Sequence, residues 1–167
     1  MTHSDPSTSH AAGAAGDPRS RKAPGVADAP TDAPRLVAER TEPGIYVATN
    51  DRGGRVRIGA PDARHAFTPG ELLQLAVAGC SAISAEANLV HHLGENFEAS
   101  LEVGAVKDDG ENRYSQVRTS FAPAMADLEP ERVEKLVGRL ERAIERLCTV
   151  GRTLEHGADH HLEITPR

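Results

Sequence analysis

An apolar stretch from Leu72 to Val90 is the feature that most constrains the fold of this chain. It follows Thr68-Pro69-Gly70-Glu71, in which threonine and glutamate have the spacing of a helix-capping box and proline takes the first helical position. We therefore predict a helix with Thr68 as its N-cap, ending near His91, His92 and Gly94. Because apolar and small residues occupy nearly all of its faces, we expect this helix to be buried on most sides.

Segments rich in β-branched and aromatic residues lie on both sides of this helix. Three of them precede it, separated by glycine-containing turns, and predict an antiparallel meander: Val37–Thr41, Ile45–Asn50 and Arg55–Ile58. After the helix, alternating runs at Leu101–Ala105 and Tyr114–Phe121 flank the turn Asp108-Asp109-Gly110. These runs predict a hairpin with one exposed face.

A second helix is predicted where apolar residues recur at helical spacing from Val133 to Leu147. Cys148 follows directly, then a loop through His156-Gly157, and His161 to Thr165 resembles a final short strand. The predicted class is α+β, with the element order βββ, α, ββ, α, β.

Residues 1–34 are dominated by small and polar residues and by proline, so they cannot bury enough apolar surface to offset their ordering entropy. We expect a disordered arm at 1–34 and one domain over 35–167. The arm has no apolar core of a signal peptide, and the run Leu72–Ile83 is too short to span a bilayer, so we expect a cytoplasmic protein. The net charge of −6, with charges of both signs interleaved, argues against nucleic acid or membrane partners.

The chain contains two cysteines, Cys80 and Cys148. In a reducing compartment a single widely spaced pair is a poor candidate for a structural disulfide, which leaves redox chemistry or simple burial. Two segments resemble the OsmC/Ohr family of osmotically inducible and organic hydroperoxide resistance proteins. The first runs from Pro69 through Glu71-Leu72-Leu73 and Ala76 to Cys80, and the second is Leu147-Cys148. The resemblance extends over roughly Arg35 to Pro166 and includes the element order.

This resemblance implies an OsmC-like fold, with antiparallel sheets packed around a central buried helix in an intertwined homodimer. It also implies a thiol peroxidase, in which Cys80 reduces an organic hydroperoxide, or hydrogen peroxide, and becomes a sulfenic acid that Cys148 resolves. An external dithiol reductant, a lipoyl protein or a thioredoxin-like protein, would then reduce the disulfide. No cofactor or metal is implied.

The family's arginine, which accompanies the thiolate, corresponds best to Arg40, with Arg52 as the second choice; either could instead be a solvated arginine. The family's glutamate falls at Gly70, and the neighbouring Glu71 is better explained as part of the capping box. Thr149 stands where the family usually has proline. Both departures favour an alternative: a non-catalytic OsmC-like stress or small-ligand-binding protein with unreactive buried cysteines.

Other polar clusters have simpler explanations. We interpret the group His156, Asp159, His160 and His161 as a solvated loop rather than a metal site, because no second set of ligands has a matching spacing. Glu86 is expected to be either exposed to solvent or buried at a subunit interface.

Overall fold

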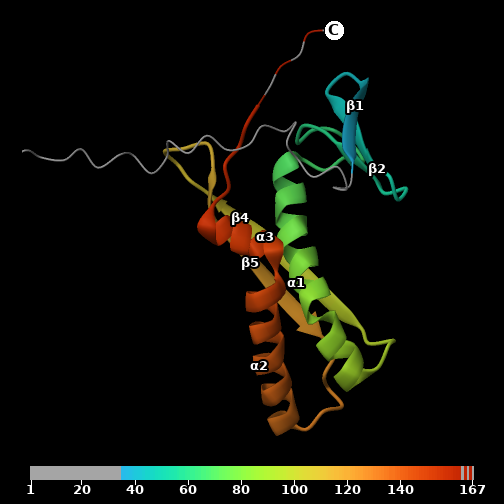
Figure 1. Cartoon of the computed structure of the whole chain (residues 1–167), viewed down its shortest axis with the longest axis vertical. Coiled ribbons are helices and arrows are strands. Elements are labelled where there is room, and N and C mark those ends of the chain that lie inside the picture. The colour runs from blue at the N-terminus through green and yellow to red at the C-terminus, as the bar shows by residue number, and fades with distance from the viewer. Residues whose placement is uncertain (1–34, 163, 165, 167) are drawn as a thin grey trace, which may run out of the picture. The chain divides into compact units, whose positions relative to one another are not determined.

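The structure, a computed structural model, describes residues 35–162, 164 and 166. The chain divides into two units, and the described helices and strands all lie in the unit Pro34–Ala158 (Figure 1). The predicted arm at 1–34 falls outside the described residues. In chain order the elements are β1 (Leu36–Glu42), β2 (Ile45–Asn50), β3 (Arg55–Ile58), α1 (Pro69–Leu93), β4 (Ala99–Lys107), β5 (Tyr114–Pro123), α2 (Pro130–Leu147) and α3 (Thr149–His156).

Strands β1, β2 and β3 form the predicted antiparallel meander. Gly44 allows the tight β1–β2 turn because its φ of 72° lies in a region that side chains with a Cβ disfavour. In the β2–β3 turn, the side-chain oxygen of Asn50 accepts hydrogen bonds from the backbone N–H groups of Arg52 and Gly54 at 3.0 and 2.8 Å. The turn residues therefore close both hairpins through local contacts.

The capping box confirms the predicted start of α1. The Glu71 N–H donates to the Thr68 hydroxyl at 3.2 Å, and the Thr68 N–H donates to the Glu71 carboxylate at 2.6 Å. At the other end, Gly94 has a φ of 92° and its N–H donates to the Val90 carbonyl at 2.9 Å. Glu71 is thus committed to the helix start.

Within the chain, α1 is buried along one face only, so the expectation of burial on most sides is wrong for a single chain. Leu89 is fully buried, whereas Ile83 is 78% exposed. The other elements that pack on α1 cover only part of its circumference, which leaves a second apolar face open. The buried residues of α1 are Ala78, Ser81, Ala85 and Leu89.

The length of α1 also corrects the expectation that its apolar segment is too short for a membrane. By length and composition alone, the 25-residue helix could cross a bilayer. This is weak evidence, because the core helix of a soluble protein passes the same test. Contacts with β4, β5, α2 and α3 of the same chain are those expected of a core helix.

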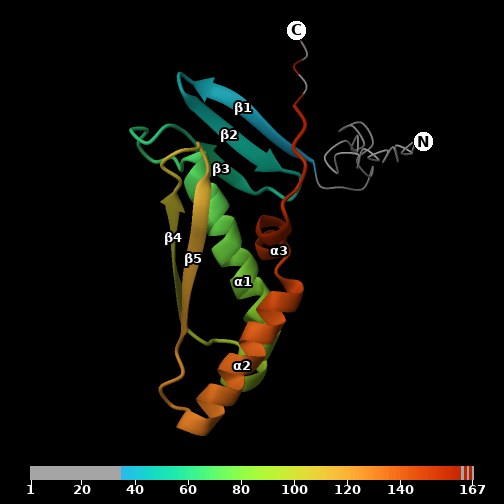
Figure 2. The ribbon, with the colours of Figure 1, turned by 90° about the vertical axis from the view of Figure 1, so that its left-hand side faces the viewer.

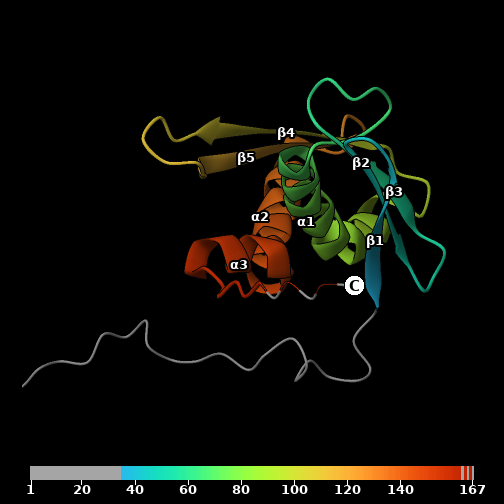
Figure 3. The same cartoon turned by 90° about the horizontal axis from the view of Figure 1, so that it is seen from above.

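The core lies between α1 and α2 and is covered by the β4–β5 hairpin. Leu136 and Leu140 of α2 pack against Ala85 and Leu89 of α1, and Phe121 of β5 closes the cluster. The hairpin and α3 lie on opposite sides of α1, and α2 lies beside α1 (Figures 2 and 3). The apolar residues at helical spacing in α2 and at alternate positions in β5 therefore form the faces that pack against α1.

The structure differs from the sequence-based order after Cys148. The expected loop is an eight-residue helix, α3 (Thr149–His156). The described residues of the expected last strand, His161, Leu162 and Ile164, are not in a strand, and the other two lie outside the described residues. The helix forms because Cys148 caps its first turn and Gly157, with a φ of 73°, ends it.

Candidate functional site

The two cysteines, far apart in the sequence, meet where α1 contacts α3. Cys80 lies near the middle of α1 and is partly exposed, while Cys148 lies between α2 and α3 and is only 3% exposed. The thiol of Cys148 lies near Cys80 and is one of the groups that lower the pKa of the Cys80 thiol. Both are free thiols. The arrangement places a buried thiol beside a partly exposed one.

The N-terminus of α3 points at this pair. The backbone N–H groups of Val150 and Thr149 lie near the sulfur of Cys80 and lower the pKa of its thiol, and the Gly151 N–H donates to the sulfur of Cys148 at 3.4 Å. The first N–H groups of a helix have no partners within the helix and carry a partial positive charge. The end of α3 is therefore suited to hold a negatively charged sulfur.

These contacts set the ionisation of Cys80. The hydrogen bond from the Val150 N–H is the largest influence and lowers the pKa of the Cys80 thiol. Burial raises that pKa, but Cys148, Thr149 and Ser84 lower it further, and the net pKa lies below the ordinary value of a cysteine. A lowered pKa and partial exposure are the properties of a reactive cysteine.

Two serines of α1 complete the surroundings of the cysteines, and the sequence analysis missed both. Ser81 is 8% exposed; its hydroxyl donates to the Val77 carbonyl at 2.9 Å and lies 3.8 Å from the sulfur of Cys148. Ser84 donates to the Cys80 carbonyl at 2.7 Å. Ser81 directly follows Cys80 and Ser84 lies one helical turn after it, so their spacing from Cys80 could have identified them in the sequence.

The predicted arginines are placed elsewhere in the described part of the chain. Arg40 lies in β1, exposed and paired with Tyr46 across the sheet. Arg52 lies in the β2–β3 turn, 3.8 Å from the Asp51 carboxylate. No described contact joins either guanidinium to Cys80, so the role assigned to Arg40 stays a prediction.

Gly70, the residue at the position of the family's glutamate, packs against the ring of Tyr114. A Cβ at Gly70 would overlap the Tyr114 hydroxyl and would lie 3.0 Å from the ring carbon that bears it. Glu71 is held by Thr68, whose backbone N–H lowers the pKa of its carboxyl. The space next to Gly70 is therefore filled by a residue from β5, and Glu71 is not available to replace the carboxylate.

The remaining candidates do not form a site within the described residues. No group of three or more histidine, cysteine, aspartate or glutamate side chains there is arranged to hold a metal ion. Glu86 is exposed on α1.

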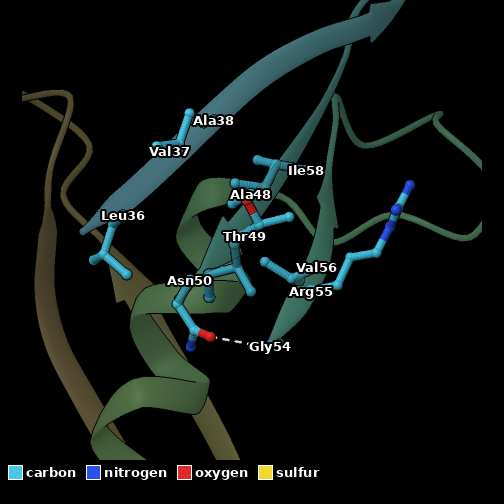
Figure 4. A pocket seen from close by; sticks show the side chains of 11 residues that line it. Leu36, Val37, Ala38, Ala48, Thr49, Asn50, Gly54, Arg55, Val56 and Ile58 are labelled. Atoms are coloured by element: carbon cyan, nitrogen blue, oxygen red, sulfur yellow. Dashed lines mark hydrogen bonds between the residues drawn. The ribbon is translucent and has the colours of Figure 1, made fainter. Parts of the chain in front are cut away.

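A separate apolar pocket of 420 Å³ lies on the β1–β3 sheet (Figure 4). Its walls include Leu36, Ala48 and Val56 from the three strands and Leu72 from the start of α1. Neither cysteine lines it. The pocket leaves an apolar surface open next to the N-terminal part of α1.

A family model and curated relatives both match most of the described domain. The family model described as OsmC-like protein matches residues 60–163. An uncharacterized protein of Mycobacterium tuberculosis is 35% identical over 130 residues, which cover 78% of this chain and 95% of the relative.

Solved structures show the same fold at low sequence identity. An OsmC-like protein from Mycoplasma pneumoniae matches with a TM-score of 0.58 and 14% identity, over 76% of this chain and 90% of that one. A hypothetical protein from Aquifex aeolicus matches with a TM-score of 0.60 and 13% identity, over 77% and 91%. The family match over most of the domain, together with this shared α+β fold, shows that the chain belongs to the OsmC-like protein family.

Proposed function

We propose that this protein is a cysteine-based thiol peroxidase that reduces organic hydroperoxides, with Cys80 as the attacking residue and Cys148 as the resolving residue. The observation that carries the proposal is the end of α3, where backbone N–H groups and a second thiol surround the sulfur of Cys80. Family membership supports a peroxide-related role. The lowered pKa of Cys80 favours the thiolate that such a reaction needs.

In the proposed reaction, the Cys80 thiolate attacks the distal oxygen of the hydroperoxide and the O–O bond breaks. Sulfur is oxidised by two electrons to sulfenic acid, and the alkoxide leaves as the alcohol after taking up a proton. The Cys148 sulfur then attacks the Cys80 sulfur, so that an S–S bond forms and the S–O bond breaks to release water. A dithiol reductant, a lipoyl or thioredoxin-like protein, returns both thiols by exchange.

We also propose that the protein is a homodimer in which a second copy covers the exposed apolar surfaces. Ile83 and Leu75 of α1 are 78% and 44% exposed, and Leu36 beside the sheet pocket is 76% exposed. Surfaces of this kind are typical of protein–protein contacts. Sedimentation equilibrium tests this assembly: a wild-type monomer at micromolar concentration, or an Ile83→Asp variant that dimerises as strongly as the wild type, contradicts it.

We assign the action of the protein to the cytoplasm, where free thiols such as Cys80 and Cys148 persist. Cell fractionation with an antibody against the chain tests this assignment. Recovery in the membrane or secreted fraction contradicts it.

Arg40 remains our proposed cation for the thiolate. Matched variants test it: Arg40→Ala should slow oxidation of Cys80 by hydroperoxide, while Arg52→Ala should leave the rate unchanged. Equal rates for both variants and the wild type would remove Arg40 from the proposed site.

The alternative function, a non-catalytic ligand-binding protein, is favoured by one observation. The apolar pocket on the β1–β3 sheet is separate from the cysteines and is lined mainly by aliphatic side chains. A protein that used this pocket would have no need of a reactive thiol at Cys80. The two functions are separated by the behaviour of the thiols.

The decisive experiment adds about one equivalent of cumene hydroperoxide to the reduced protein and follows free thiols and intact mass. We expect both thiols to disappear within seconds, with a mass loss that corresponds to one disulfide. Cys80→Ser should abolish the loss, and Cys148→Ser should stop at a sulfenic acid that dimedone traps. If both thiols persist for hours in the wild type, the peroxidase proposal is wrong and the pocket becomes the candidate site.

A further inference from the structure

Cys148 joins two helices through three hydrogen bonds. Its N–H donates to the Ile144 carbonyl at 2.8 Å, which closes α2, and its carbonyl accepts from the Arg152 N–H at 3.0 Å, which starts α3. Its sulfur accepts from the Gly151 N–H at 3.4 Å and so takes the place of a capping side chain. Cys148 is thus the C-cap of α2 and the N-cap of α3 at once.

Helix α3 depends on its cap more than α1 or α2 does. It has eight residues, none of them fully buried, and its contacts with another element are mainly with α1. Isolated helices of this length are marginal in water because nucleation is costly. Contacts at its first turn therefore have a large share in holding it in place.

The same first turn carries the groups that face Cys80. Thr149 and Val150 are the first two residues after the cap, and their N–H groups lie near Cys80 and lower the pKa of its thiol. Gly151 allows the cap to sit close, since a Cβ there would lie 3.2 Å from the sulfur of Cys148. The side chain of Cys148 therefore contacts the same turn of α3 whose N–H groups influence Cys80.

We propose that Cys148 has a second role that precedes disulfide formation: as the N-cap of α3, it holds the Thr149 and Val150 N–H groups against the sulfur of Cys80. Cys148 is in this respect a positioning residue for Cys80. The inference rests on the proposed function only in naming Cys80 as the attacking residue.

The test compares Cys148→Ser with Cys148→Ala. Both variants lack the resolving thiol, but a serine hydroxyl caps a helix well and alanine does not. The first measurement is the pH dependence of Cys80 alkylation by iodoacetamide. We expect Cys148→Ser to retain reactive Cys80 at neutral pH and Cys148→Ala to react about threefold to tenfold more slowly there, its midpoint shifted to higher pH.

The second measurement is hydrogen exchange of the α3 amides, which separates capping from a direct contact between the two side chains. Loss of the cap speeds exchange in Thr149–His156, whereas loss of a contact with Cys80 alone leaves that exchange unchanged. We expect faster exchange in Cys148→Ala than in Cys148→Ser. Equal exchange in the two variants overturns the proposal, even if their alkylation rates differ.

Gly151→Ala keeps both thiols. It tests the same cap if Cys148→Ala fails to fold. The added methyl group should displace the cap sulfur and slow alkylation of Cys80, although alanine favours a helix more than glycine does. Gly138→Ala, in the middle of α2, is the matched control and should alkylate like the wild type. Wild-type rates in Gly151→Ala count against the proposal. None of these measurements uses hydroperoxide. They therefore test the role of Cys148 as a cap even if the protein has no peroxidase activity.

Discussion

The hydroxyl of Tyr114 in β5 lies where the first side-chain carbon of any residue other than glycine at position 70 would have to be. Two residues far apart in the sequence therefore compete for one space: a larger residue at position 70 would have to displace the tyrosine ring. Tyr114 therefore occupies the space that the side chain of a glutamate at position 70 would enter.

We predict that Gly70→Ala lowers the free energy of unfolding by about 1–3 kcal/mol, because the new methyl group overlaps the tyrosine. Tyr114→Ala in the same chain should recover part of this loss. Urea unfolding of the two single variants and the double variant measures the coupling. Strictly additive losses would show that the two residues do not compete for the same space.

The ionisation of Cys80 should depend on single backbone donors of α3. Val150→Pro removes the donor with the largest influence, and Thr149→Pro removes a weaker one at a helix position where proline is well tolerated. We predict that Val150→Pro raises the pKa of Cys80 and that Thr149→Pro raises it less, because the Val150 N–H is the larger influence on the Cys80 thiol. Thiolate absorbance during a pH titration measures both, and a larger effect of Thr149→Pro contradicts this order.

Substitutions at Leu89 and Ile83 distinguish the buried face of α1 from its exposed face. Leu89→Ala should cost about 2–5 kcal/mol of unfolding free energy, since the side chain is fully buried against α2. Ile83→Ala should cost the isolated chain little, because Ile83 is 78% exposed, but should weaken the proposed dimer. Unfolding at low concentration measures the first effect and sedimentation the second. A large loss for Ile83→Ala in the monomer would mean that its face is covered within the chain.

His92, at the end of α1, should make the protein sensitive to acid. Burial is the main cause that lowers the pKa of His92, and the charges of His91, Arg139 and Arg132 lower it further. A histidine pKa that is lower in the folded than in the unfolded state contributes stability above the unfolded value of about 6.5. This contribution is lost as the pH falls from there through the folded pKa.

We therefore predict that His92→Gln, which cannot take up a proton, loses less stability than the wild type between about pH 7.5 and pH 5. Glu86→Gln on the exposed surface of α1 is the control and should follow the wild type. Chemical unfolding at the two pH values measures the difference. Parallel losses in His92→Gln and the wild type would show that another group causes the acid sensitivity.

Much of the fold could be predicted from local signals. Thr68 and Glu71 mark the start of α1 through contacts three residues apart, and the glycine-containing turns place β1 to β3. The helical spacing of Leu136 and Leu140 predicts α2. These predictions were confirmed because each depends on residues that are near each other in the chain.

The sequence alone therefore predicted the strands and helices up to Cys148. It also named Cys80 and Cys148 as candidate residues and, through resemblance, the family. The tertiary structure decided that α1 is buried on one face, that Tyr114 fills the space at Gly70 and that α3 directs its N-terminus at Cys80. The α3 groups that influence Cys80 are backbone N–H groups, which nearly every residue carries. No residue type in the sequence therefore predicts them. Their effect depends on packing between α1 and α3, and only the folded chain establishes that packing.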